Sequence, residues 1–75
     1  SFNFAYWGYT ELHKEPMDKE KVRIIGNRLN DIGGKGLMMM SYYLLCWDIK
    51  CGGMIVGSYT RLIEFWWDGI GDWMA

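Results

Sequence analysis

The clearest hydrophobic pattern in the chain is a one-sided stripe that ends just before a pair of glycines. Its four members recur at steps of three, four and three, which places them on one face of an α-helix: Val22, Ile25, Leu29 and Ile32. Pro16 comes just before, where proline is tolerated because a first-turn N–H has no helical partner. Gly33–Gly34 follows as a stop signal. The pattern predicts a helix over about residues 17–32.

The next segment, residues 36–50, is apolar on almost every side. Between Leu37 and Trp47 the main interruption is Ser41, and there is no charged residue. We expect a helix here, although a pair of buried strands is the alternative because Tyr42–Trp47 has some β-propensity. A helix that is apolar all round must be surrounded, and two other helices of one short chain cannot wrap it. The segment therefore favours a second chain as a partner.

A third helix is expected over residues 54–68, followed by a tail over residues 69–75. Gly69 suits the left-handed position after a helix. Glycine and β-branched residues near the start leave a strand over Met54–Thr60 open. Six apolar residues form the broad face of this helix: Ile55, Tyr59, Leu62, Ile63, Trp66 and Trp67.

The first fifteen residues have a different pattern. Phe2, Phe4 and Tyr6 alternate with smaller or polar residues, and a period of two favours extended structure. We expect an aromatic arm over residues 1–15 that lies across the helices. Together the segments predict one all-α domain over residues 1–75. It is a small three-helix bundle with an extended N-terminal arm, completed by dimerisation.

Aromatic residues are in excess. The 75-residue chain contains 3 Phe, 5 Trp and 5 Tyr residues, 17% of the total. Each large aromatic buries roughly 150–250 Å² when enclosed, and a domain of this size cannot enclose all of them, so we expect an exposed apolar interaction surface. We predict that seven residues form a homodimer interface: Met39, Tyr43, Leu44, Trp47, Trp66, Trp67 and Trp73.

An alternative use of the same aromatics is a pocket for a flat or apolar small molecule, since ligand cavities are mostly apolar with a few polar groups. Its expected walls come from three segments: Tyr6, Trp7, Tyr43, Trp47 and Trp66. The leading hypothesis is a non-enzymatic interaction or structural protein that self-associates as a twofold dimer, the commonest closed assembly.

Charge and composition argue against several other classes. The net charge is −1, from eight basic and nine acidic residues, so no field attracts nucleic acid or an anionic membrane. The apolar run from Leu37 to Trp47 is far shorter than the roughly 20 residues that span a bilayer, and Ser1–Thr10 lacks the pattern of a secretory signal. Cys46 and Cys51 would point apart on a helix, so we expect free thiols and a cytoplasmic location.

Two segments could form a catalytic or phosphate-binding site. His13 has Glu11 and Glu15 close by in the sequence, but no nucleophile is tied to it by a motif. Gly33-Gly34-Lys35-Gly36 lacks the preceding strand and the following hydroxyl residue of a phosphate loop. We expect an exposed histidine and a helix–helix turn.

Two clusters could hold a metal ion. Asp68 and Asp72, with Glu64 one turn earlier, form a segment that is too short for a calcium loop. The consecutive residues Met38–Met40 point about 100° apart on a helix, so they cannot converge on a soft metal. We therefore expect no catalytic residue, no metal site and no cofactor.

Overall fold

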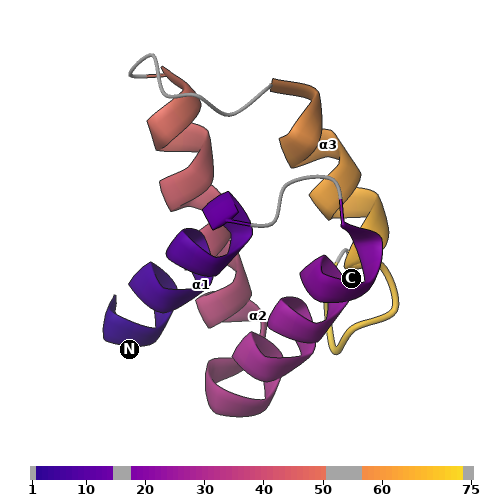
Figure 1. Ribbon diagram of the computed structural model, residues 1–75. Helices are drawn as coiled ribbons and strands as arrows, with labels where there is room; N and C mark the ends of the chain where they lie inside the picture. Colours follow the sequence, from indigo (N-terminus) through magenta and orange to yellow (C-terminus); the bar gives the residue numbers. More distant parts are fainter. Residues whose placement is uncertain (1, 15–17, 51–56, 74–75) are drawn as a thin grey trace.

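Helices form all the regular secondary structure in the part of the chain that the structure describes. The computed structural model describes residues 2–14, 18–50 and 57–73. It contains α1 (Phe2–Lys14), α2 (Lys19–Lys50) and α3 (Gly57–Trp66), followed by turns up to residue 73 (Figure 1). The all-α class is confirmed for these ranges. Residues 54–56 lie outside them, and residues 57–60 are helical.

α2 is broken at Gly34. Its φ of 68° and ψ of −160° lie outside the right-handed helical region. Glycine adopts such a positive φ without steric strain because it has no Cβ. The chain turns back at this point, and Figure 1 shows two helical rods joined at one end, residues 19–33 and residues 35–50. The two helices expected over residues 17–32 and 36–50 are thus the two halves of α2.

Replacing Gly34 with alanine is expected to lower the free energy of unfolding by about 1–3 kcal/mol, the cost of holding a residue with a Cβ in a backbone region that is essentially limited to glycine. The added Cβ would meet no atom within 4 Å, so backbone strain alone is measured. Gly36→Ala is the matched control. Its Cβ also faces open space but its φ is not positive, so urea unfolding should show a gain of up to about 1 kcal/mol. Equal effects of the two substitutions would contradict the turn at Gly34.

The extended arm expected over residues 1–15 is wrong, because Phe2–Lys14 form α1. The alternation of large aromatics hid a helical stripe of smaller residues. Ala5, Gly8 and Leu12 recur at steps of three and four and are fully buried. A period of two over only five residues is weak evidence for extended structure. The helical stripe continues for two turns and is the stronger signal.

Small residues let α1 pack closely against both halves of α2. The Ser41 hydroxyl donates a hydrogen bond of 2.9 Å to the carbonyl oxygen of Ala5. A Cβ at Gly8 would collide with the Ser41 hydroxyl and with Leu29. Since Leu29 lies in the first half of α2 and Ser41 in the second, α1 sits across the pair.

α3 also contacts both halves of α2 through its C-terminal end. The Trp67 indole N–H donates to the carbonyl of Val22 at 2.7 Å, in the first half. Glu64 accepts a hydrogen bond from Tyr42 at 2.9 Å, in the second half. The Arg23 guanidinium donates to the carbonyls of Trp66 and Asp68, where the last turn of a helix leaves acceptors unpaired.

The core lies between these helices and includes two tryptophans. The rings of Trp67 and Trp73 pack edge to face with centroids 5.0 Å apart. The chain reaches this position because Gly69 and Gly71 have φ values of 89° and 53° and fold the end of the chain back. The buried apolar residues are Ala5, Leu12, Val22, Ile25, Leu29, Leu37, Met38, Leu45, Tyr59, Ile63, Trp67, Ile70 and Trp73.

Candidate functional site

An apolar stripe is exposed on the second half of α2. Met40, Tyr43, Leu44 and Trp47, here called the α2 stripe, have the spacing i, i+3, i+4 and i+7 and so share one helix face. Trp47 is 64% exposed and Tyr43 57%, and Leu44 is half-buried. The four side chains line an open hollow of about 320 Å³.

The opposite face of the same half-helix is buried. Leu37, Met38, Ser41 and Leu45 point into the core, where α1 and the first half of α2 cover them. The segment that was expected to be apolar all round therefore has one face covered by its own chain. On the face that carries the α2 stripe, Met40, Tyr43 and Trp47 are exposed and Leu44 is half-buried.

The structure divides the seven predicted interface residues. Tyr43, Leu44 and Trp47 belong to the α2 stripe, while Met39 and Trp66 are half-buried beside the core. Trp67 and Trp73 are a correction: they are 0% and 8% exposed and belong to the core, although Trp73 also lines a hollow. The sequence pattern near the C-terminal end does not indicate which tryptophan rings become buried, because the turns at Gly69 and Gly71 decide this. Met40, which the sequence reasoning left out of the interface, is exposed.

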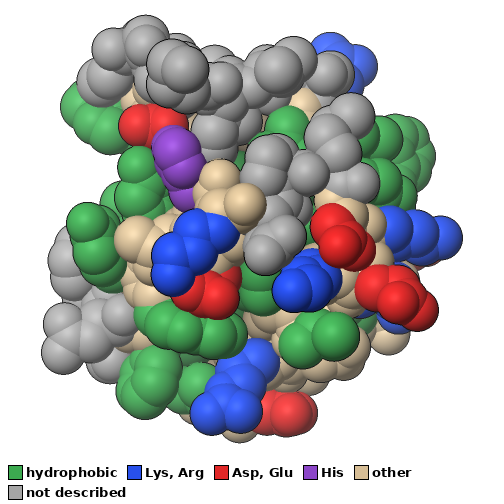
Figure 2. Space-filling model, in the orientation of Figure 1, with side chains coloured by type: hydrophobic (Ala, Val, Ile, Leu, Met, Phe, Trp, Pro, Cys, Tyr) green, Lys and Arg blue, Asp and Glu red, His purple; other side chains and the backbone are tan. Residues whose placement is uncertain are grey.

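The predicted small-molecule pocket is not assembled from its expected walls. Trp7 lines an open groove between α1 and the first half of α2. On the face of the molecule that Figure 2 shows, apolar side chains lie among basic and acidic ones. The other residues of this groove are Phe4, Glu11, Lys21, Ile24, Ile25, Arg28 and Ile32. Tyr43 and Trp47 instead line the hollow of the α2 stripe. Tyr6 is exposed on α1, and Trp66 is half-buried on α3.

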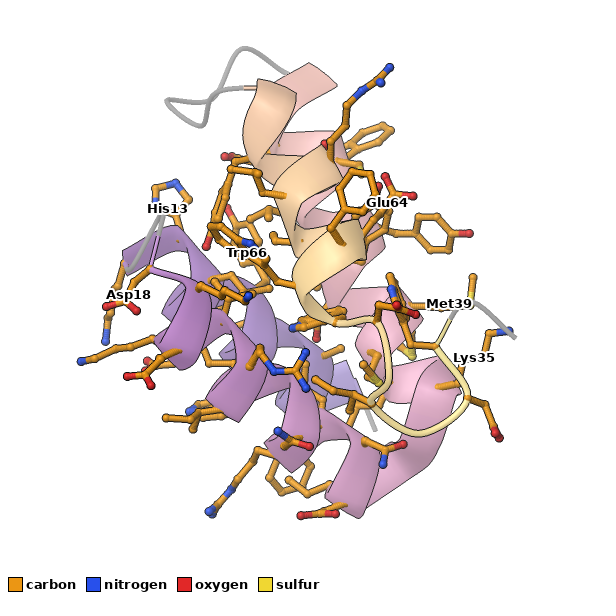
Figure 3. All side chains as sticks on the ribbon, turned by 90° about the vertical axis from the view of Figure 1, so that its right-hand side faces the viewer. His13, Asp18, Lys35, Met39, Glu64 and Trp66 are labelled. Atoms are coloured by element: carbon orange, nitrogen blue, oxygen red, sulfur yellow. The ribbon has the colours of Figure 1, made fainter. Side chains whose placement is uncertain are left out.

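A different hollow joins aromatic rings to a carboxylate. It is about 230 Å³ in volume and is here called the Tyr42–Glu64 hollow. In Figure 3 the Met39 label lies between those of Glu64 and Lys35, three residues that line this hollow. The hollow is lined by Lys35, Met39, Tyr42, Tyr43, Glu64 and Trp73. The sequence reasoning missed it because its walls come from α2, α3 and the C-terminal turns.

The hydrogen bond between Tyr42 and Glu64 changes the titration of the phenol. Burial, and then the bond to the Glu64 carboxylate, raise the pKa of Tyr42 above its usual value of 10.0, because both disfavour the phenolate. Burial also raises the pKa of the Cys46 thiol. Cys46 is a free, half-buried thiol, and Cys51 lies outside the described residues.

Tyr42 is therefore expected to ionise at a higher pH than a free tyrosine in an ultraviolet absorbance titration, with Tyr42→Phe identifying its signal. The unfolded chain loses this proton first, because its tyrosine pKa is about 10. The contribution of Tyr42 to stability is thus full below pH of about 10 and declines above it. Glu64→Gln should bring the ionisation of Tyr42 to lower pH. A Tyr42 signal with a pKa of about 10, the value of a free tyrosine, would contradict the assigned contact.

The single histidine pairs with a residue far along the chain. His13 Nε2 lies 3.5 Å from Asp48 Oδ2, and the Tyr9 ring packs edge-on against the imidazole at 5.9 Å. Glu11 instead pairs with Lys14 at 3.2 Å, and Glu15 lies outside the described residues. The Asp48 Oδ2 atom is buried without a hydrogen bond within the described part of the chain, since 3.5 Å is too long for one. The contact joins α1 to the end of α2.

The remaining segments that were considered for phosphate or metal binding do not come together in one site. Gly33–Lys35 form the bend between two helical segments, and Asp68 and Asp72 are exposed. Met38 is buried whereas Met40 is exposed. Within residues 2–14, 18–50 and 57–73, no three His, Cys, Asp or Glu side chains are grouped to hold a metal ion. Over the same ranges, no helix has the length and apolarity needed to cross a membrane.

No protein-family model, curated protein or solved structure matches the chain.

Proposed function

We propose that this chain is a self-associating interaction protein and that the α2 stripe is its interface. The observation that carries the proposal is the exposure of Trp47 and Tyr43 on one uncharged helix face. Leaving two large aromatics in water is unfavourable, and an exposed apolar patch usually marks a contact surface. The same face of a second chain is also apolar and aromatic, so it can cover these side chains.

The spacing of the stripe suits the pairing of two helices. Residues at i, i+3, i+4 and i+7 form the seam along which helices pack with interlocking side chains. The chain carries no charge between Lys35 and Asp48, so the face imposes no like-charge contact. An antiparallel, twofold arrangement brings the Lys35 end of one helix towards the Asp48 end of the other and opposes the helix dipoles.

The size of the stripe limits the strength of the complex. Trp47 and Tyr43, each more than half exposed, add together roughly 200–300 Å² per chain. A standard interface buries about 800 Å² per partner. The two rings thus supply the centre of a small interface, and the dimer is expected to be reversible and dependent on concentration.

Isotope-filtered nuclear Overhauser spectroscopy on a mixture of labelled and unlabelled chains tests the assignment. Contacts between chains are expected from the Met40 methyl group to the Tyr43 and Trp47 rings. Contacts between chains that involve Phe65 on α3, with none from the α2 stripe, would place the interface elsewhere. A sample with no contacts between chains would argue against self-association at that concentration.

A further inference from the structure

The Tyr42–Glu64 hollow has inclined aromatic walls. The Tyr42 and Tyr43 rings have centroids 5.9 Å apart and planes inclined at 58°. The Tyr42 and Trp73 rings are 5.7 Å apart and inclined at 71°. Rings at these distances and angles pack against each other in a tilted or edge-to-face arrangement, and all three also line the hollow. The negative faces of aromatic rings attract a cation that lies within about 6 Å.

Glu64 places a negative charge at one end of these walls. Its side chain is half-buried, and Oε2 accepts a hydrogen bond of 2.9 Å from the Tyr42 hydroxyl. Among the described residues Glu64 makes no ion pair. A carboxylate accepts several hydrogen bonds, so its remaining acceptor positions are available to a ligand. Lys35 also lines the hollow, and in Figure 3 it lies beyond Met39 from Glu64.

We propose that the Tyr42–Glu64 hollow binds the ammonium group of a small organic cation. The cation lies against the Tyr42, Tyr43 and Trp73 rings at the end of the hollow where Glu64 supplies the opposite charge. An alkylated ammonium fits better than an inorganic ion because its weakly hydrated methyl groups also contact Met39 and the rings. The volume of about 230 Å³ selects a small head group.

The proposal goes beyond self-association and does not depend on it. All six lining residues belong to one chain, so the hollow is complete in a monomer. Tyr43 also belongs to the α2 stripe, but Glu64 does not. Substitution of Glu64 therefore tests ligand binding, and substitution of Trp47 tests assembly.

Titration with choline, followed by the chemical shift of the Trp73 indole N–H and by tryptophan fluorescence, tests the inference. Sodium chloride at equal ionic strength and the uncharged carbon isostere of choline, with a tert-butyl in place of trimethylammonium, are the controls. Choline is expected to produce a saturable shift and the isostere a much weaker one. Equal responses to choline and its isostere, or a choline response no larger than that of sodium chloride, would overturn the proposal.

Variants locate the site. Glu64→Gln keeps the shape of the side chain and removes its charge, so choline affinity should fall about 10- to 100-fold. Glu20→Gln, an exposed acidic residue in the first turn of α2, should leave affinity unchanged. Tyr43→Leu, at an exposed position, removes one wall and gives a second test if Glu64→Gln unfolds the chain. Unchanged affinity in Tyr43→Leu or in a folded Glu64→Gln variant would contradict the assigned site.

Discussion

Replacing Trp67 with alanine is expected to destabilise the protein by about 3–5 kcal/mol, the range for deleting a buried large aromatic. A domain of this length has a total stability of only about 5–10 kcal/mol. The variant should therefore keep only about 0–7 kcal/mol of stability, and its near-ultraviolet circular dichroism should be lost at a much lower urea concentration than in the wild type.

The expected size of this effect follows from what Trp67 contacts. Its side chain is fully buried, its N–H satisfies the carbonyl of Val22, and its ring packs on Trp73. Gly26 is the point of closest approach, since a Cβ there would collide with the Trp67 indole. Gly26→Ala should therefore also destabilise the protein, by about 1–3 kcal/mol.

Phe65→Ala is the matched control for Trp67. Phe65 is 74% exposed and lies two residues away in the sequence, so the same truncation should change the free energy of unfolding by less than about 0.5 kcal/mol. Urea unfolding followed by circular dichroism measures both variants. Similar losses in the two variants would mean that Trp67 is not the centre of the core.

Replacing Trp47 with glutamate is expected to abolish self-association without unfolding the chain. The side chain is 64% exposed, so the charge remains in water in the monomer. In the twofold dimer the two carboxylates would lie in an apolar contact, where an unpaired charge is strongly disfavoured. The dissociation constant should rise by at least about 100-fold, which corresponds to roughly 2.7 kcal/mol.

Phe65→Glu controls for the added charge and for the loss of an exposed aromatic. It introduces the same carboxylate on α3, away from the α2 stripe. Sedimentation velocity should show a monomer for Trp47→Glu and the wild-type distribution for Phe65→Glu. If Phe65→Glu dissociates the dimer and Trp47→Glu does not, the interface lies on α3.

Local pattern predicted the helices of α2 and the break between them. Val22, Ile25 and Leu29 of the predicted stripe are buried as expected, whereas Ile32, its fourth member, is 40% exposed. The same reasoning failed for α1, because Ala5 and Gly8 carry almost no hydrophobic signal. They are buried because their small size allows close packing, a property that only the neighbouring helix reveals.

The candidate sites depended on contacts between distant residues. The exposed character of Tyr43 and Trp47 could be expected from a helix with more apolar surface than one chain can cover. The burial of Trp73 could not, because it depends on positive φ values at Gly69 and Gly71. The pairing of Tyr42 with Glu64 joins residues on α2 and α3, and no local spacing indicates it.

Sedimentation equilibrium of the wild-type chain over a wide dilution series tests the central claim most directly. The account predicts a mass that approaches twice the 8.8 kDa of one chain at high concentration and falls towards one chain on dilution. A mass that stays at 8.8 kDa up to the highest concentration would contradict self-association through the α2 stripe.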